Sequence, residues 1–198
     1  KKNNIHYPGS GIPSASNLFG HHELAWLFYK GHEKERSGDD IWVRLKSEIK
    51  LENSPCIVLS SEDFYNPQFN IALMKKELEG MKVKIIVYLR NYIGFLRALY
   101  FEGIKKNNFS SSFRNFVLKR KNSINYNSRL KKWGKHFGAE NIIIRLYDSI
   151  EPGEGLLRDF SDQIGFDFSL ADGHPEKRLN ITVSDKMISI IRALNKLE

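Results

Sequence analysis

The chain has 198 residues and a net charge of +8, so we expect one domain over residues 1–198 and an anionic partner. No apolar run approaches the length of a membrane span, and the opening KKNNIHYPGSGIPS lacks the apolar segment that a secretory signal needs. The single cysteine, Cys56, excludes a disulfide framework and fits a reducing compartment, so we expect a cytoplasmic protein.

The first half of the chain predicts helices alternating with short apolar strands. Ile41, Leu45 and Ile49 repeat every four residues and form one apolar stripe, as in an amphipathic helix. Asn66 and Pro67 are a typical cap and first residue of a helix. In chain order we expect a loop over the first 20 residues, helices over 21–31 and 41–53, a strand over 55–61, a helix over 66–79, a strand over 82–89 and a helix from 91 towards 106.

The second half continues the alternation. We expect a polar loop over 106–113, a helix over 123–138, a strand over 141–148, a helix over 155–165, a loop over 166–183 and a last helix capped by Ser184, in which Met187, Ile190, Ile191 and Leu194 share one face. Strands joined through helices by short connections pair in parallel. The sequence therefore predicts an α/β fold with a mainly parallel sheet flanked by helices.

In parallel sheets, ligands bind at the carboxyl ends of the strands. Arg90 ends one predicted strand, and the next helix starts immediately after it. Its guanidinium suits phosphate recognition, to which the free N–H groups of the helix start would contribute. An ion pair with Glu62 or Asp148 is an equally acceptable interpretation of Arg90.

Glu62 follows Ser60 and Ser61 at another strand end, where it is either a general base or a carboxylate of the turn. The adjacent His21 and His22 point in different directions on a helix, so they cannot easily share a metal ion. No cysteine or histidine spacing resembles a zinc site, and we expect no metal. One of the two histidines could accept a proton, and a plain surface or core role is the alternative.

The excess of basic residues lies largely between Lys105 and Lys135. It is either a solvated lysine-rich face or a surface for an anionic ligand. Aromatic residues are interleaved there but match no nucleic-acid motif, so we expect no nucleic-acid partner. The chain contains neither a G-x-S-x-G elbow nor a G-x-x-x-x-G-K-[ST] loop.

Several stretches in order resemble bacterial sulfotransferases that modify polysaccharides. They are HHELAWLF, IVLSSEDF, KVKIIVYLRNYIGFLRALYFEGIKK, WGKHFGAENIIIRLYD, GLLRDFSDQIGFDF and RLNITVSDKMISIIRALN. The resemblance implies a P-loop NTPase-like α/β fold. It also implies transfer of a sulfuryl group from 3′-phosphoadenosine 5′-phosphosulfate (PAPS) to a hydroxyl or amine of a carbohydrate, for example in capsule biosynthesis.

The resemblance also implies roles for individual residues. Arg90 matches an arginine that binds the 3′-phosphate of the nucleotide, but Ala98 stands where the family has a serine. Arg97 is a neighbouring cation that could substitute for that contact. The late loop residues Arg178 and Asn180 are further expected nucleotide contacts.

His22 and Glu62 are the expected bases, and His21 and Ser61 the expected substrate contacts. The family's Gly-rich loop with Lys and Thr is not recognisable in the chain. We therefore expect the first strand and its phosphosulfate loop to lie upstream of Lys1, with truncation at both ends. The alternative is a catalytically inactive sulfotransferase-like domain that binds a glycan or a nucleotide.

Overall fold

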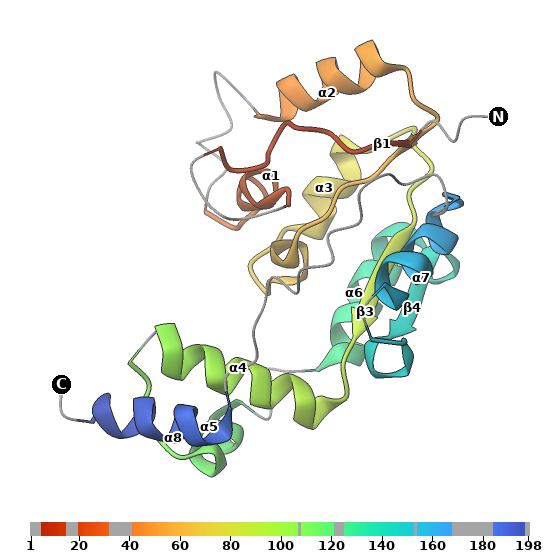
Figure 1. The fold of residues 1–198 in the computed structure, drawn as a ribbon. Helices are drawn as coiled ribbons and strands as arrows, with labels where there is room; N and C mark the ends of the chain where they lie inside the picture. The colour runs from red at the N-terminus through yellow and green to blue at the C-terminus, as the bar shows by residue number, and fades with distance from the viewer. Residues whose placement is uncertain are drawn as a thin grey trace. The chain divides into compact units, whose positions relative to one another are not determined.

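A computed structural model describes residues 5–14, 20–31, 41–106, 108–120, 125–152, 154–167 and 184–196, and Figure 1 shows the fold. The chain divides into two compact units. Unit 1 consists of residues 1–85 and 128–142, and unit 2 consists of residues 86–127 and 143–198. Helices and short strands occur in both units, so the α/β class predicted from the sequence is confirmed.

Unit 1 begins with a short strand, and most of the helices of this unit come from the first half of the chain. Its elements are β1 (Ile5–His6), α1 (His22–Trp26), α2 (Ile41–Glu52), β2 (Cys56–Ile57), the 3-10 helix η2 (Glu62–Tyr65), α3 (Ile71–Glu77), most of α6 (Tyr126–Phe137) and the 3-10 helix η3 (Ala139–Asn141). β1 pairs in parallel with β2, with Ile5 opposite Cys56 and His6 opposite Ile57. A strand at this position was not expected.

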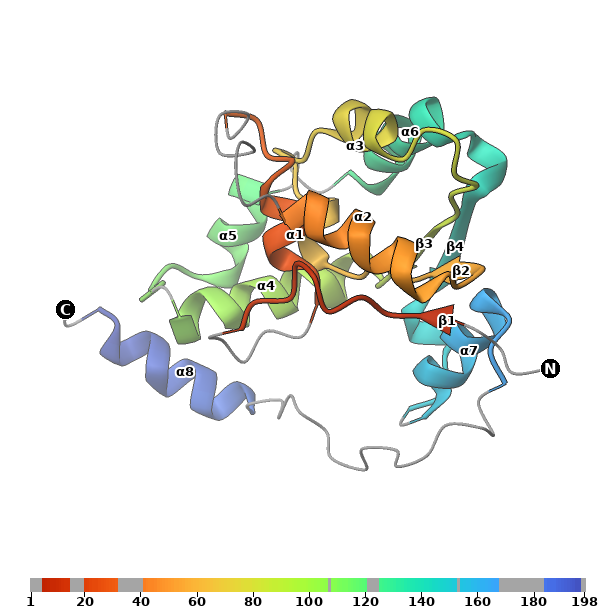
Figure 2. The ribbon, with the colours of Figure 1, turned by 90° about the horizontal axis from the view of Figure 1, so that it is seen from above.

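The core of unit 1 is formed by apolar side chains of its helices and of the segments that join them. Leu24, Phe28 and Leu45 are fully buried. Burying each such side chain stabilises the fold by about 1.5–3 kcal/mol. Trp133 of α6 stacks on Phe69, which precedes α3, at 5.6 Å between ring centroids. Figure 2 shows α3 and α6 side by side. The packing of Trp133 explains why residues 128–142 belong to unit 1.

Unit 2 contains the second pair of strands and the longest helix. Its elements are most of β3 (Ile85–Leu89), α4 (Tyr92–Lys106), α5 (Phe113–Arg120), most of β4 (Ile142–Leu146), the 3-10 helix η4 (Tyr147–Ser149), α7 (Gly155–Ile164) and α8 (Asp185–Leu194). β3 pairs with β4. Asp159 of α7 accepts a 2.7 Å hydrogen bond from the Tyr88 hydroxyl of β3 and pairs with Arg145 of β4. These contacts hold α7 to both strands.

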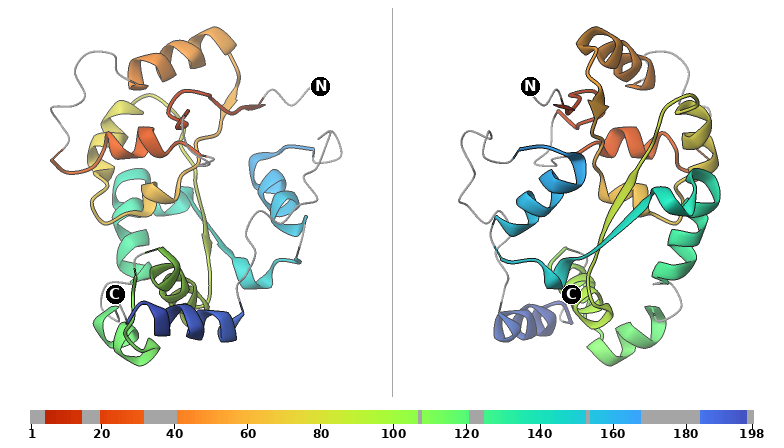
Figure 3. Two further views of the ribbon diagram at one scale, coloured as in Figure 1. Left: turned by 60° about the vertical axis from the view of Figure 1, so that its left-hand side comes forward. Right: turned by 90° about the vertical axis from the view of Figure 1, so that its right-hand side faces the viewer.

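A separate core holds α4, α5 and α8 together in unit 2. Leu96 and Ile104 of α4 are fully buried, as is nearly all of Ile188 of α8. The Asn195 side chain donates a 2.9 Å hydrogen bond to the carbonyl of Ile104 and so holds the end of α8. Figures 1 and 3 show α8 next to α4. No helix in the described ranges is long and apolar enough to cross a membrane.

The prediction of one sheet was wrong. Within the described residues the strands form two separate two-stranded sheets. The predicted strand 55–61 contributes only two residues, after which the N–H of Val58 makes a last bond to the carbonyl of His6. The carbonyl of Ser60 then accepts a 2.6 Å hydrogen bond from the N–H of His21. The strand ends early because its backbone is held by the segment before α1.

One helix prediction needs correction, and one helix was not predicted. Asn66 does not begin a helix: its carbonyl accepts from the N–H of Phe69 in a turn, and α3 starts after Asn70, whose side chain accepts from the N–H of Leu73. Phe69 forms a β-bridge with Tyr29, and a residue in a β-bridge cannot be part of a continuous helix. Helix α5 was not predicted. The helices expected over 41–53, 91–106, 123–138 and 155–165 and from Ser184 are confirmed within a few residues.

Candidate functional site

A polar cluster in unit 1 joins the start of α1 to the turn after β2. Ser61 caps η2, since its hydroxyl accepts a 3.1 Å hydrogen bond from the N–H of Asp63. The Nδ1 atom of His22 lies 2.9 Å from Asp63 Oδ2 and 3.1 Å from Ser61 Oγ. The structure thus brings together two of the residues singled out from the sequence, His22 and Ser61, and adds Asp63.

Asp63 is the acceptor at the centre of this cluster. Besides His22, the Trp26 indole donates a 2.8 Å hydrogen bond to Oδ2 and the Tyr29 hydroxyl a 2.7 Å hydrogen bond to Oδ1. Burial alone would raise the pKa of Asp63, but the bonds from Tyr29, His22 and Trp26 outweigh it and lower that pKa. Burial and the neighbouring carboxylate raise the pKa of Tyr29. Asp63 is therefore a stable anion and Tyr29 a stable donor.

This geometry sets the tautomer of the His22 ring. A carboxylate accepts and cannot donate, so Nδ1 carries a proton, and in the neutral ring the lone pair is on Nε2. The side chain is 12% exposed, and no described residue forms a hydrogen bond with Nε2. A Cβ at Gly20 would lie 3.3 Å from Nε2 and 2.9 Å from the carbonyl oxygen of Ser60. Glycine therefore keeps this side of the ring open, and Nε2 is suited to accept a proton.

His21, the other expected histidine, is not part of this cluster. Its ring is fully buried, with Nδ1 accepting from the N–H of Ser60 at 3.0 Å and Nε2 donating to the carbonyl of Pro8 at 2.9 Å. Burial lowers the pKa of His21, which is the direction for a neutral ring. Both nitrogens are used by the backbone, so His21 holds the loop before α1 and has no atom left for a substrate.

Glu62 is exposed on the first turn of η2, and its neighbour Asp63 is the residue that contacts His22. Asp63 was not among the site residues predicted from the sequence. The signal was present, since an aspartate two residues after a serine is typical of a capped turn, but nothing in the sequence shows that α1 lies over that turn.

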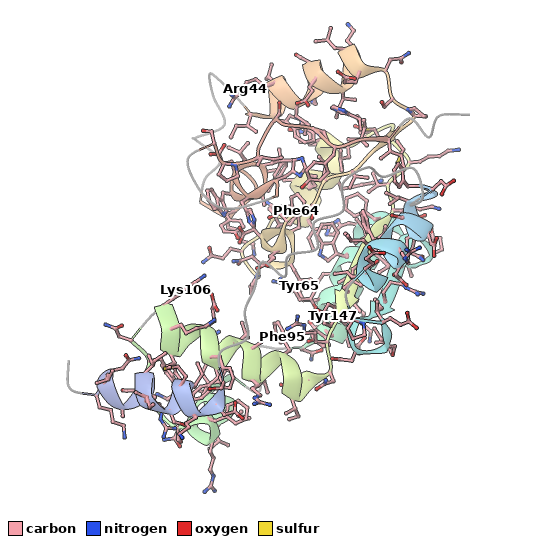
Figure 4. All side chains as sticks on the ribbon, viewed as in Figure 1. Arg44, Phe64, Tyr65, Phe95, Lys106 and Tyr147 are labelled. Atoms are coloured by element: carbon pink, nitrogen blue, oxygen red, sulfur yellow. The ribbon has the colours of Figure 1, made fainter. Side chains whose placement is uncertain are left out.

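Arg90 lies at the end of β3, as predicted, and is exposed. Its guanidinium stacks on the ring of Tyr147 at 4.3 Å. Tyr147, labelled in Figure 4, follows β4 directly. Asp148 accepts a 2.5 Å hydrogen bond from the N–H of Asn91, and the Asn91 side chain accepts from the N–H of Gly94 at 2.7 Å. Two N–H groups at the start of α4, where an anion was expected to bind, therefore already donate to side chains of the protein.

The other expected nucleotide contacts either bind another part of the chain or lie outside the described residues. Arg97 forms an ion pair with Asp185 of α8, and Ala98 is partly buried on α4. Arg178 and Asn180 lie outside the described residues. The structure therefore leaves Arg90 as the expected phosphate contact whose surroundings are best defined.

The loop after β1 binds a carboxylate through its backbone. The N–H groups of Gly9 and Ser10 donate to Glu48 at 2.8 and 3.0 Å. The same loop is bonded to α1, because the N–H of Glu23 donates to the carbonyl of Gly11 at 3.2 Å. Successive N–H groups that converge on a carboxylate form a nest that can hold other anions. From the sequence this segment was predicted to be a loop, with no ligand assigned to it.

Comparisons with known proteins do not assign a family. No family model matches the chain, and no solved structure matches it. A protein of Archaeoglobus fulgidus, described as an uncharacterized protein, is 28% identical over 142 residues, or 71% of this chain. The matched region is 38% of that relative's length. Over the described ranges, no group of three or more histidine, cysteine, aspartate or glutamate residues could hold a metal ion.

Proposed function

We propose that the protein transfers a sulfuryl group from PAPS to a hydroxyl, or an amine, of a carbohydrate or polysaccharide in the cytoplasm. The observation that carries this proposal is the His22 ring, with Nδ1 bound to Asp63 and Nε2 available. A histidine in this state is a competent general base for an acceptor hydroxyl. The resemblance to polysaccharide sulfotransferases, with their P-loop-type fold, supplies the donor and the reaction class.

In this proposal His22 Nε2 takes the proton of the acceptor hydroxyl as its oxygen forms a bond to sulfur. The bond between sulfur and the phosphate oxygen breaks, and the nucleotide leaves with that electron pair as 3′-phosphoadenosine 5′-phosphate (PAP). Asp63 stabilises the imidazolium that forms, since its carboxylate is 2.9 Å from Nδ1. Ser61, 3.1 Å from the same nitrogen, helps to keep the ring in place.

PAPS supplies an activated sulfuryl group on a polyanionic carrier, so the chain must offer it groups that bind anions. The backbone nest of Gly9 and Ser10 already holds a carboxylate and is bonded to the first turn of α1, which carries His22. It fits the 5′-phosphosulfate, although it lacks the lysine found in the family. The role of Arg90, exposed at the end of β3, in binding the 3′-phosphate stays a prediction from the sequence.

Three observations favour the second candidate, an inactive domain that binds a glycan or a nucleotide. Asp148 occupies the N–H of Asn91, Glu48 occupies the nest of Gly9 and Ser10, and Ala98 replaces a serine hydroxyl. Each of these takes a contact away from a nucleotide anion. Catalysis requires the donor to displace Glu48 from the nest.

The two candidates differ in a transfer assay. The protein is incubated with ³⁵S-labelled PAPS and a panel of neutral and acidic polysaccharides, and label in the polymer is counted after the nucleotides are removed. We expect label that depends on both protein and acceptor. Thermal stabilisation by PAP without transfer supports the inactive domain. Both candidates are rejected if there is no transfer and neither millimolar PAP nor any polysaccharide of the panel stabilises the protein.

A further inference from the structure

A pocket in unit 2 lies among α4, α5 and α8, away from the residues used above in unit 1. Its volume is about 260 Å³. The rings of Tyr100, Phe101 and Phe113 line it together with Ile188, and Arg97 and Arg192 supply its cationic groups. Tyr100 and Ile188 are nearly fully buried and belong to the core of the unit. The aromatic wall is thus a fixed part of the fold.

Arg192 is held in place by a neutral partner. Its Nη1 donates a 3.2 Å hydrogen bond to the Tyr100 hydroxyl, which itself donates to the carbonyl of Ser111 at 2.9 Å. No carboxylate in the described part of the chain forms an ion pair with Arg192, although the side chain is partly buried. A guanidinium has five N–H donors, so most remain for a ligand. A partly buried cation whose partner among the described residues is a neutral phenol favours an anion.

Arg97 is a second cation at the mouth of the pocket, and its ion pair is weak. It pairs with Asp185, and the two side chains are 54% and 69% exposed. Exposed pairs of this kind contribute at most about 1 kcal/mol, so an anion can replace Asp185 at low cost. The Arg97 guanidinium also lies 5.2 Å from the centre of the Phe101 ring, which keeps it beside the aromatic wall.

We propose that this pocket binds a small aromatic anion, a single ring that carries a carboxylate, sulfate or phosphate. The ring packs against Tyr100, Phe101 and Phe113, and the anionic group binds Arg192, with Arg97 closing over it. The volume is at the lower end for ligand sites, which suits one ring better than a nucleotide. The proposal does not depend on the sulfotransferase activity, since the pocket is lined by none of His22, Asp63, Gly9, Ser10 and Arg90.

Phenyl phosphate is a suitable probe of the whole site. Phenol probes the aromatic contacts alone, and inorganic phosphate probes the anion contacts alone. We expect saturable binding of phenyl phosphate by titration calorimetry, with a Kd of roughly 0.1–1 mM for so small a ligand. Phenol and phosphate should each bind at least about tenfold more weakly, because each lacks one of the two contacts. Equal binding of phenyl phosphate and phosphate would overturn the aromatic half of the proposal.

Two variants test the location of the site. Arg192→Gln should weaken phenyl phosphate binding at least about tenfold, whereas Arg114→Gln, an exposed arginine on α5 outside the pocket, should leave it unchanged. Ser189→Trp places a bulky ring in the pocket and should abolish binding while Arg192 is retained, so the location stays testable if Arg192→Gln does not fold. Unchanged binding in Arg192→Gln or in Ser189→Trp, or displacement of phenyl phosphate by stoichiometric PAP, would overturn the proposal.

Discussion

His22 and Asp63 form a hydrogen-bonded pair, although forty residues separate them in the sequence. The carboxylate sets the tautomer of the ring, because it can only accept the Nδ1 proton. Trp26 and Tyr29 in turn hold the carboxylate from α1 and the segment after it. A substitution at Asp63 should therefore change the tautomer of the His22 ring, even where the fold is kept.

The tautomer can be measured directly. In ¹⁵N-resolved NMR of the wild type above pH 7.5, we expect His22 with the proton on Nδ1. Asp63→Asn removes the obligatory acceptor, so the Nε2–H form should gain population. Asp162→Asn, an exposed position on α7, is the control and should leave the spectrum of His22 unchanged. An Nε2–H ring in the wild type would contradict the proposed role of His22.

Glu48 predicts a dependence of stability on pH. Partial burial works to raise the pKa of Glu48, but hydrogen bonds from Ser10, Gly9 and His6 outweigh it and lower the pKa to about 2. A carboxylate with a lowered folded-state pKa stabilises the fold above its ordinary pKa of 4.5, and this contribution disappears as the pH falls towards 2.

Glu48→Gln should therefore lower the free energy of unfolding by about 1–3 kcal/mol at pH 7. The difference from wild type should stay constant down to about pH 5 and then shrink towards pH 2. Urea titrations at several pH values measure it, with Glu52→Gln, exposed at the end of α2, as the control. A difference that persists unchanged at pH 2 would show that Glu48 acts through packing instead.

The sequence predicted part of the candidate site. Histidines, a serine and a carboxylate near a strand end were identifiable because such residue types are common in catalysis. Asp63 was not, since its role depends on how α1 packs on the turn after β2. Nor was the burial of His21, which depends on the carbonyl of Pro8 and the backbone of Ser60. These are tertiary contacts with no signature in local sequence.

At the scale of the elements, helix ends follow local rules well. Gly165 ends α7 in the left-handed region at φ 71°, where a side chain is unfavourable and a glycine is preferred. Gly103 lies inside α4, where a Cβ would make ordinary contact with Phe109 at 3.6 Å. The two glycines should therefore respond oppositely to the same substitution.

Gly165→Ala should lower the free energy of unfolding by about 1 kcal/mol, because alanine is strained at this backbone conformation. Gly103→Ala should raise it by about 0.5–1 kcal/mol, since alanine favours the helix and loses less entropy on folding. Chemical denaturation followed by circular dichroism compares both with wild type. The same sign for both variants would contradict the backbone assignment at one of these positions.

Periodic elements were predictable and context-dependent ones were not. Ile41, Leu45 and Ile49 correctly indicated α2, and Ser184 correctly indicated the start of α8. The helix expected at Asn66 failed because Phe69 pairs with Tyr29 and is buried instead. The single sheet failed because strand pairing is decided by the partners that each strand finds, and hydrophobicity does not identify them.

At the scale of the whole molecule, the chain passes between the units at residues 85, 127 and 142. The first and last of these positions lie at the start of β3 and of β4, so each strand begins in unit 1 and continues in unit 2. Each unit has its own core. Because the strands are shared, we expect the two units to unfold together.

The three tryptophans, Trp26, Trp42 and Trp133, all belong to unit 1. Tryptophan fluorescence therefore follows unit 1, whereas far-ultraviolet circular dichroism follows both units. Ile104→Val in the core of unit 2 should cost about 0.5–1.5 kcal/mol and lower the urea midpoint equally by both probes. A shift seen by dichroism alone would show that the units unfold separately.

In the proposed function, His22 is the base of the sulfuryl transfer. The most direct measurement compares the initial rates of transfer from labelled PAPS for wild type, His22→Gln and Glu62→Gln. We predict that His22→Gln is slower by roughly 10²–10⁴-fold, because it lacks a proton acceptor. Glu62→Gln should keep a rate close to wild type, since its exposed carboxylate is not the one that contacts His22. A His22→Gln variant with the wild-type rate would show that His22 is not the base.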